Sequence, residues 1–391
     1  MAAAGSGAAD PLDTPRQSGH KARRDTGRGS NTMSKKVVIV GGGYVGTELA
    51  QSLERYCDVT LVERKQFFCH VPVMIRSLVQ PELFEQALFP YDKLLQTGRV
   101  VQASAAEVNE SGVTLEDGKT LGADAIVVAT GSSHDTAFKA PGASVEELRE
   151  ANRALAQQIE GASSIAIIGG GALGVELAGE IKALRTHKQV TLVSDTPLID
   201  GYDPRLGQGL EAKLGLLGVE VITGRTAVDL PQTRGAFPGP IRLDDGREIA
   251  ADLVIPALGS TPNTALLDPL PGVEKTADGR VRNDRWLRPS ALPNVFAAGD
   301  AVDSGDHMTI VGASRQTPWL ARSLRNFLAG KRTDRTAAYG PWRNAPLLVP
   351  LGEHVGQSIL PVVGLVGSRT TRLVKGRYLF LPKYRKLFRT G

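Results

Sequence analysis

The sequence predicts an α/β protein made of two similar units, one inserted into the other, followed by a short C-terminal segment. Three observations lead to this prediction. The run VVIVGGGYVGTELAQSL at 37–53 recurs as IAIIGGGALGVELAGEI at 165–181, and LEDGKTLGADAIVVATG (115–131) recurs at the same offset of 128 residues as LDDGREIAADLVIPALG (243–259). DVTLVER (58–64) likewise matches QVTLVSD (189–195). Such a repeat indicates duplication of a whole structural unit.

Each unit begins with a continuous apolar run, which is typical of a parallel strand buried on both faces. The run is followed by Gly-x-Gly-x-x-Gly, in which successive glycines permit a tight turn, close approach of a pyrophosphate and packing of the helix on the strand. Because each match lies between a predicted strand and a predicted helix, we predict two Rossmann-like dinucleotide-binding domains. The predicted contacts are Gly41, Gly42, Gly43, Tyr44, Val45 and Gly46 in the first unit, and Gly169, Gly171 and Gly174 in the second.

The end of the second strand differs between the units. Glu63 follows Gly43 by twenty residues, where a carboxylate binds the hydroxyls of an adenosine ribose. The matching residue of the second unit is Ser194, followed by Asp195. Serine is neutral toward a 2′-phosphate and the aspartate repels it, so the pattern leaves open whether this unit takes NADH or NADPH.

After the second unit, the run LPNVFAAGDAVD (292–303) predicts that the chain returns to the first domain. Gly299 allows close backbone approach, and Asp300 offers a carboxylate for a ribityl hydroxyl. The run from Thr317 predicts a helix with Thr317 as N-cap and Pro318 at its first position. The positive end of this helix would face the flavin ring, unless it is an ordinary surface helix.

These features divide the chain into four parts. Residues 1–33 are poor in large apolar side chains and predict a disordered tail, with Met33 as an alternative start. Residues 34–150 and 280–338 form the first domain, residues 151–279 the inserted second domain, and residues 339–391 the C-terminal segment.

Composition excludes several classes of protein. The two cysteines, Cys57 and Cys69, cannot build a disulfide framework, and we expect Cys69 to be a buried thiol in a reducing compartment. The six histidines show no metal-ligand spacing, so no metal site is predicted. No apolar run is long enough for a transmembrane helix. The net charge of +5 is the sum of +4 in residues 1–36, −7 in 37–353 and +8 in 354–391, and an acidic body argues against nucleic acid as a partner.

The order of these motifs, with Thr130, Gly131 and Gly259 after the closing strands, resembles the two-dinucleotide-domain flavoprotein reductases. The resemblance covers roughly residues 36–335. It implies that the first domain, which is discontinuous, binds FAD, and that the inserted second domain binds NADH or NADPH. The cysteine pair of the disulfide reductases, four residues apart, is missing here, so the electron acceptor is expected to be a diffusible molecule.

Two further segments narrow the resemblance, namely FFCHVPVMIR (67–76) and VKGRYLF (374–380). They resemble the apoptosis-inducing-factor-like NAD(P)H:quinone reductases, which include the ferroptosis suppressors. This resemblance implies an FAD enzyme that transfers hydride from NAD(P)H to flavin and then two electrons to a quinone. It implies catalytic roles for His70, Glu176 and Lys375. It also implies that Arg76 contacts the FAD pyrophosphate and that Val100 lies near the adenine. Thr317, at the predicted helix start, is expected to contact the flavin.

The motifs also allow two alternative functions. One is a reductase of a ferredoxin or rubredoxin, and the other is a non-enzymatic flavoprotein that senses NADH. The family's acylated N-terminus is missing, and its Phe-Gly-Gly is Tyr44-Val45-Gly46 here.

The last twenty residues alternate Lys and Arg with Leu, Tyr and Phe, and the whole segment 354–391 contains no acid. Such a pattern suits the headgroup region of an anionic bilayer. We therefore expect a cytoplasmic protein in peripheral contact with the inner face of a membrane. The same pattern also allows two other interpretations. The segment could bind RNA, or it could pack on the flavin domain. The sequence predicts no oligomeric state.

Overall fold

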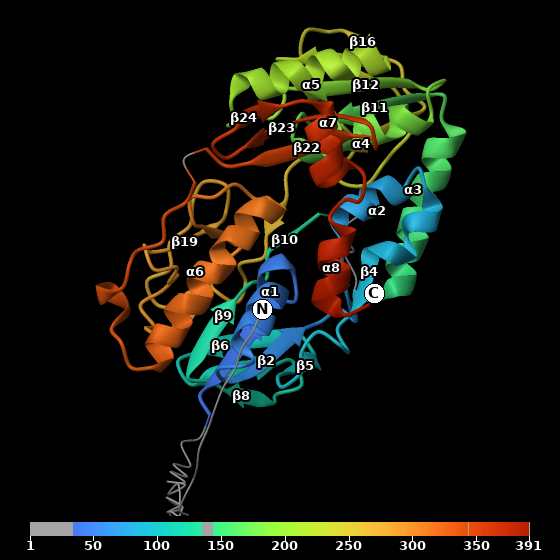
Figure 1. Ribbon diagram of the computed structural model, residues 1–391. Coiled ribbons are helices and arrows are strands. Elements are labelled where there is room, and N and C mark those ends of the chain that lie inside the picture. Colours follow the sequence, from blue (N-terminus) through green and yellow to red (C-terminus); the bar gives the residue numbers. More distant parts are fainter. Residues whose placement is uncertain (1–33, 135–143, 343, 391) are drawn as a thin grey trace, which may run out of the picture. The chain divides into compact units, whose positions relative to one another are not determined.

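The structure, a computed structural model, describes residues 34–134, 144–342 and 344–390 (Figure 1). The predicted disordered tail, residues 1–33, lies outside the described residues. Two parallel sheets form the framework. The first has the strand order β20-β9-β1-β2-β5 and the second β13-β12-β11-β17. Both sheets carry helices, so the predicted α/β class with two Rossmann-like units is confirmed.

The first sheet is built around the apolar strand β1, which pairs in parallel with β2 and β9. Val37 and Ile39 lie in one hydrophobic core and Val38 and Val40 in another, as a strand buried on both faces requires. The return of the chain adds β20, whose Val295 pairs with Ile126 of β9. The strands and helices of this unit are β1 (Lys36–Val40), α1 (Tyr44–Leu53), β2 (Asp58–Glu63), β5 (Arg99–Gln102), β9 (Ala125–Val128), β20 (Val295–Ala297) and α6 (Ile310–Leu328).

The second sheet repeats this arrangement around β11, which pairs in parallel with β12 and β17. Its members are β11 (Ser164–Ile168), α4 (Ala172–Leu184), β12 (Gln189–Ser194), α5 (Pro204–Leu217), β13 (Val219–Thr223) and β17 (Leu253–Pro256), preceded by α3 (Val145–Gly161). Each unit also carries a three-stranded antiparallel sheet just before its closing strand. These are β6 (Ala105–Asn109), β7 (Gly112–Leu115) and β8 (Thr120–Gly122) in the first unit, and β14 (Ala227–Val228), β15 (Ile241–Leu243) and β16 (Glu248–Ile249) in the second. The predicted internal repeat is therefore confirmed.

Short elements connect the two units and shape the first one. These are β3 (Phe67–Cys69), α2 (Val71–Ser77), η1 (Pro81–Leu83), η2 (Glu85–Ala87), β4 (Leu88–Pro90), β10 (Ser132–Ser133), β18 (Thr261–Pro262), β19 (Val281–Arg282), β21 (Val302–Asp303) and η3 (Thr333–Arg335). Strands β10 and β18 pair with each other. The segment that leads from the first unit to the second therefore lies beside the segment that returns to the first.

The C-terminal segment contacts both units. Its antiparallel sheet packs on α4 and α5 of the second unit, and its last helix packs on β4 of the first. The segment consists of β22 (Leu347–Leu351), β23 (Val355–Leu360), β24 (Gly364–Val366), α7 (Ser368–Thr371), the π-helix η4 (Arg372–Gly376) and α8 (Leu381–Phe388). It therefore closes the region where the two units meet.

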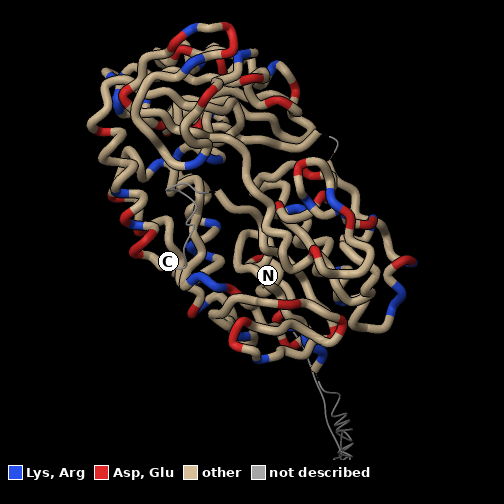
Figure 2. The backbone as a smooth tube through the Cα atoms, turned by 180° about the vertical axis from the view of Figure 1, so that it is seen from behind, with Lys and Arg blue, Asp and Glu red and all other residues tan. Residues whose placement is uncertain are grey.

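Acidic and basic positions alternate along the backbone of both units in Figure 2. No broad face of one sign is visible in that view.

Candidate functional site

A cavity of about 610 Å³ opens at the carboxyl ends of the first sheet's strands, where the two units meet. This is the edge at which open α/β sheets bind ligands. Many predicted site residues line it, namely Gly41, Gly42, Gly43, Tyr44, Val45, Glu63, Thr130, Gly131, Glu176, Gly299, Asp300 and Lys375. The cavity thus brings together residues from both units and from the C-terminal segment.

The first glycine turn has the geometry of a phosphate cradle. Gly41 has a φ of +106°, and a Cβ on Gly46 would lie 1.8 Å from the Gly41 carbonyl oxygen. A Cβ on Gly43 would meet no protein atom within 4 Å, and helix α1 begins at the next residue with no side-chain cap. The first N–H groups of α1 are therefore available to an anion. These residues fit a dinucleotide pyrophosphate.

Two carboxylates stand at strand ends beside this turn. Glu63 Oε2 accepts a hydrogen bond from Gly42 N at 2.6 Å, which fixes the carboxylate next to the turn. Asp300, after β20, accepts a hydrogen bond from Ser132 Oγ at 2.8 Å. Both side chains line the cavity. Carboxylates in these positions can accept hydrogen bonds from sugar and ribityl hydroxyls.

The second glycine turn has nearly the same geometry. Gly169 has a φ of +123°, and a Cβ on Gly174 would lie 2.0 Å from the Gly169 carbonyl oxygen. Helix α4 begins at Ala172 with no side-chain cap, and the position of a Cβ on Gly171 is open. Ser194 ends β12 beside Gly170. The second unit is therefore also built to receive a dinucleotide pyrophosphate.

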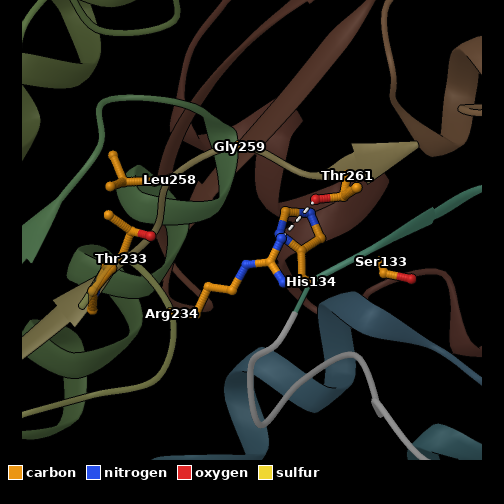
Figure 3. A pocket seen from close by; sticks show the side chains of 8 residues that line it. Ser133, His134, Thr233, Arg234, Leu258, Gly259 and Thr261 are labelled. Carbon is orange, nitrogen blue, oxygen red and sulfur yellow. Dashed lines mark hydrogen bonds between the residues drawn. The ribbon is translucent and has the colours of Figure 1, made fainter. Parts of the chain in front are cut away.

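A smaller pocket of about 200 Å³ lies at the carboxyl end of β17, next to this second turn (Figure 3). Gly259 and Leu258 form part of its wall. Arg234 reaches across it and donates a hydrogen bond to Thr261 Oγ1 at 3.0 Å, with His134 beside it. The predicted cofactor residue Gly259 thus lies at this pocket, on the edge of the sheet where a second nucleotide is expected.

Glu176 and Lys375 meet at the junction of the two units. The Lys375 ammonium donates to Glu176 Oε1 at 2.5 Å and to the Leu348 carbonyl at 3.0 Å. Both side chains are buried, and both line the cavity. Burial raises the pKa of the Glu176 carboxyl, and the adjacent ammonium opposes that rise. Lys375 thus places an ammonium, and Glu176 a carboxyl group, in a cavity wall that is otherwise largely apolar.

Comparison with known proteins decides the family. A sequence model of the family described as pyridine nucleotide-disulphide oxidoreductase matches residues 90–317, and a second model of the same description matches residues 36–118. The chain belongs to this family. Its two dinucleotide sites are accordingly an FAD site and an NAD(P)H site, and the protein is an NAD(P)H-dependent flavoprotein oxidoreductase.

Individual relatives agree with the predicted resemblance. The chain is 29% identical to apoptosis-inducing factor homolog B of Dictyostelium discoideum, with 90% of this chain and 96% of that protein covered. It is 27% identical to ferroptosis suppressor protein 1 of Taeniopygia guttata, with 90% and 95% covered.

Solved structures share the fold. The sulfide:quinone oxidoreductase of Aquifex aeolicus superposes with a TM-score of 0.70 at 17% identity, with 91% of this chain and 92% of that one covered. The putidaredoxin reductase in its covalent complex with putidaredoxin superposes with a TM-score of 0.62 at 22% identity, with 83% and 80% covered.

His70 lies behind the cavity of the first unit rather than on its wall. Its side chain is fully buried, and its neighbours Cys69 and Val71 line the cavity instead. His70 Nε2 bonds the Leu379 carbonyl, which can only accept, so Nε2 carries the proton. Nδ1 then accepts from the Tyr44 hydroxyl at 3.1 Å. Both ring nitrogens have protein partners, and the catalytic role expected for His70 stays a prediction.

Burial lowers the pKa of His70 from 6.5 to about 3. The imidazole is therefore neutral in the native flavoprotein but gains a proton on unfolding below about pH 6.5, so its contribution to stability falls as pH falls. Between about pH 7 and about pH 5 this loss amounts to roughly 2 kcal/mol.

We expect urea unfolding of the wild type to show that its free energy of unfolding falls by this amount between about pH 7 and about pH 5. The variant H70Q should show a smaller loss, because its side chain does not titrate. An equal pH dependence in both proteins would contradict the account.

Two predicted cofactor residues, Arg76 and Val100, are not among the residues that line the cavity. Arg76 is buried, and its guanidinium pairs with Glu180 at 2.8 Å. Val100 lies on β5 and pairs with Leu61, while the residues that line the cavity nearby are Ala103, Ser104 and Ala105. The contacts predicted for Arg76 and Val100, with the FAD pyrophosphate and the adenine, stay predictions.

The prediction that Thr317 caps a helix is wrong. Helix α6 begins at Ile310, and its N-cap is Thr309, whose hydroxyl accepts from Gly312 N at 3.0 Å. Thr317 and Pro318 lie inside the helix, and Thr317 is buried. The cavity wall includes Thr309 and Ile310. The helix end that faces the flavin cavity is therefore found eight residues earlier in the chain.

The C-terminal helix α8 is part of the core of the first unit. Tyr384 and Phe388 are fully buried, and their ring centroids lie 5.2 Å and 5.1 Å from that of Phe68. Four of the segment's cations also form ion pairs with carboxylates: Arg372 with Glu353, Lys375 with Glu176, Lys383 with Glu48 and Arg389 with Glu54. The structure therefore shows that α8 packs on the first unit.

Sequence reasoning missed several residues of the flavin cavity. Tyr91 donates from its hydroxyl to the Gly42 carbonyl at 2.7 Å, and Phe380 lines the wall opposite with a φ of +63°. Cys69 is half-buried and lines the cavity, so the expectation of a buried thiol is wrong, whereas Cys57 is buried. No local motif marks Tyr91, and its role follows only from long-range contacts. Phe380 ends the segment 374–380 that carries the family resemblance, but no cavity contact was predicted for it.

Within residues 34–134, 144–342 and 344–390, no helix is long and apolar enough to cross a bilayer. Over the same residues, no group of three or more His, Cys, Asp or Glu side chains is placed to hold a metal ion.

Proposed function

We propose that this flavoprotein oxidises NADH or NADPH and transfers two electrons through FAD to a quinone. The observation that carries the proposal is the composition of the cavity wall beyond the flavin turn. Leu347, Leu348 and Phe380 make it apolar, and the ammonium of Lys375 lies among them. A flat apolar molecule with carbonyl oxygens fits such a wall, because the rings pack on the side chains and an ammonium can donate to an oxygen.

Bound FAD supplies the redox chemistry, accepting hydride from NAD(P)H and passing electrons to the acceptor. The chain's own residues bind and orient the reactants. The open N–H groups of α4 would hold the pyrophosphate of NAD(P)H, and Glu176 would orient the nicotinamide carboxamide. Lys375 would donate a hydrogen bond to a quinone oxygen. The apolar wall would exclude water from the reacting atoms.

For His70 we propose a positioning role. Its bonds join the Tyr44 hydroxyl at the flavin turn to the Leu379 carbonyl beside Phe380. A neutral imidazole so placed connects the flavin turn to the apolar wall without entering the cavity.

Steady-state oxidation of NADH and NADPH tests this proposal. The purified flavoprotein should turn over with soluble quinones at least tenfold faster than with a ferredoxin, since the cavity fits a small apolar acceptor. A ferredoxin rate that exceeds every quinone rate would favour the iron–sulfur protein reductase suggested by the likeness to putidaredoxin reductase. Absence of turnover with any acceptor would favour an NADH sensor.

We also propose that the C-terminal segment contacts anionic membrane, through the residues it leaves exposed rather than through α8. Leu373 and Tyr378 are 79% and 52% exposed, and the Arg377 guanidinium lies over the Tyr378 ring. Exposed apolar side chains next to cations suit the headgroup boundary.

The double variant L373S/V374S should bind anionic vesicles about tenfold more weakly, because burying one leucine contributes about 1.5–3 kcal/mol. Vesicle co-sedimentation measures the effect. Binding of the wild type and of the variant should both weaken as salt rises, because salt screens the cations of the segment. The matched control is L216S, which removes a side chain 89% exposed on α5 of the second unit. If L216S lost as much affinity for the vesicles as L373S/V374S, the assignment of the membrane surface would be wrong.

A further inference from the structure

Four charged side chains are buried together where α2, α4 and η4 meet. They are Arg76 of α2, Glu176 and Glu180 of α4, and Lys375 of η4, and we call them the junction cluster. Arg76 belongs to the first unit and Lys375 to the C-terminal segment. The two glutamates belong to the second unit. The cluster is thus a point at which all three parts of the chain touch.

Within the junction cluster, Arg76 makes three directed bonds. Its Nε and Nη2 donate to the two oxygens of Glu180 at 3.0 Å and 2.8 Å. Its Nη1 donates to the carbonyl of Gly376 at 2.8 Å. A planar guanidinium can satisfy both groups at once, which the single ammonium of a lysine cannot do with the same geometry. Arg76 therefore ties α4 to the C-terminal segment.

The position of this bond along the segment is informative. Gly376 directly follows Lys375, whose ammonium is bonded to Glu176. Glu176 and Glu180 are four residues apart and so lie on one face of α4. Two adjacent residues of the segment are therefore held against two adjacent turns of the same helix.

Stability alone is a poor explanation for such a pair. A buried ion pair often stabilises a fold no better than apolar side chains of the same size, and its best-attested use is to fix one arrangement of the parts that it joins. Here the parts joined are the helix that carries Glu176 and the segment that carries Lys375.

We propose that Arg76 and Glu180 are positioning residues that hold η4 against α4 and thereby set the place of Lys375 at the flavin cavity. The inference rests on the FAD and NAD(P)H sites and not on the identity of the acceptor. It assigns Arg76 a role through Lys375 in place of direct contact with the FAD pyrophosphate.

Hydrogen exchange of the flavin-loaded protein tests the proposal, because it reports on η4 itself. The amides of Arg377 and Leu379 bond the carbonyls of Arg372 and Lys375. In E180Q and R76K these amides should exchange about tenfold faster or more, the effect of losing one charged hydrogen bond. The matched control is R185K at the end of α4, whose partner Glu160 is 62% exposed. It should leave the exchange unchanged.

Two further measurements separate the outcomes. FAD release by dilution should be the same in R76K and the wild type. The rate of flavin reduction by NADH should fall about tenfold, because a displaced Lys375 no longer holds Glu176, which orients the nicotinamide. Faster FAD release with unchanged exchange at 372–380 would overturn the proposal and assign Arg76 to the pyrophosphate. If R76K does not fold, E180Q decides: wild-type exchange and wild-type flavin reduction in E180Q would also overturn it.

Discussion

Gly46→Ala is expected to yield protein without FAD, whereas Gly174→Ala keeps FAD and loses NAD(P)H binding. In each case the added Cβ would lie about 2 Å from a carbonyl oxygen of the same glycine turn, Gly41 or Gly169. The helix must then move off its strand, which displaces the N–H groups that cradle the pyrophosphate. Such a clash costs about 1–3 kcal/mol or more. We expect at least a hundredfold loss of affinity for the corresponding dinucleotide.

Flavin absorbance per chain measures the first effect, and fluorescence titration with NADH measures the second. Gly161→Ala at the end of α3 is the control, because its Cβ would meet no atom within 4 Å. If both turn variants lost the same dinucleotide, the assignment of one cofactor to each unit would be wrong.

Glu176→Gln is expected to slow flavin reduction by NADH about a hundredfold, because a small displacement of the nicotinamide from the flavin has effects of that size. The variant also leaves the Lys375 ammonium buried without its carboxylate, so the free energy of unfolding should fall by about 3–5 kcal/mol. Anaerobic stopped-flow absorbance gives the rate, and urea unfolding gives the stability.

The exposed pair of Glu160 and Arg185 provides a matched comparison. Glu160→Gln also removes a carboxylate from the second unit. It should leave the rate of flavin reduction and the free energy of unfolding unchanged, because exposed ion pairs contribute little to stability. A Glu176→Gln variant that is less stable but reduces its flavin at the wild-type rate would show that Glu176 has only a structural role.

The glycine turns were predictable because each depends on a few adjacent residues. A positive φ at Gly41 and a close approach at Gly46 need glycine at fixed spacing, whatever the rest of the chain does. The repeat of the same pattern in the second unit predicted that the two units share one architecture.

The junction cluster was not predictable in this way. Lys375 is 199 residues from Glu176 in the chain, and Arg76 is 104 residues from Glu180. No spacing rule connects such pairs. Family resemblance could single out Glu176, Lys375 and Arg76, but it did not reveal that they share one buried site.

Helix α6 shows where local signals mislead. Thr317 followed by Pro318 has the pattern of a helix start, yet Thr309 caps the helix and the proline lies within it. Burial of Thr317 and Leu320 keeps the helix continuous at that point despite the missing N–H.

The C-terminal segment was ambiguous for a different reason. Aromatic side chains separated by cations suit either a membrane surface or a helix packed on a core. Only the contacts of Tyr384 and Phe388 with Phe68 decide that α8 is part of the core.

The central claim is that electrons pass from NAD(P)H through FAD to a quinone, and a double-mixing experiment tests it most directly. The anaerobic flavoprotein is first mixed with one equivalent of NADH and then with a soluble quinone, while flavin absorbance is followed. The account predicts that the absorbance disappears in the first step and returns in the second within a single turnover time. Bleaching that persists in the presence of quinone, but is reversed at once by ferredoxin, would contradict it.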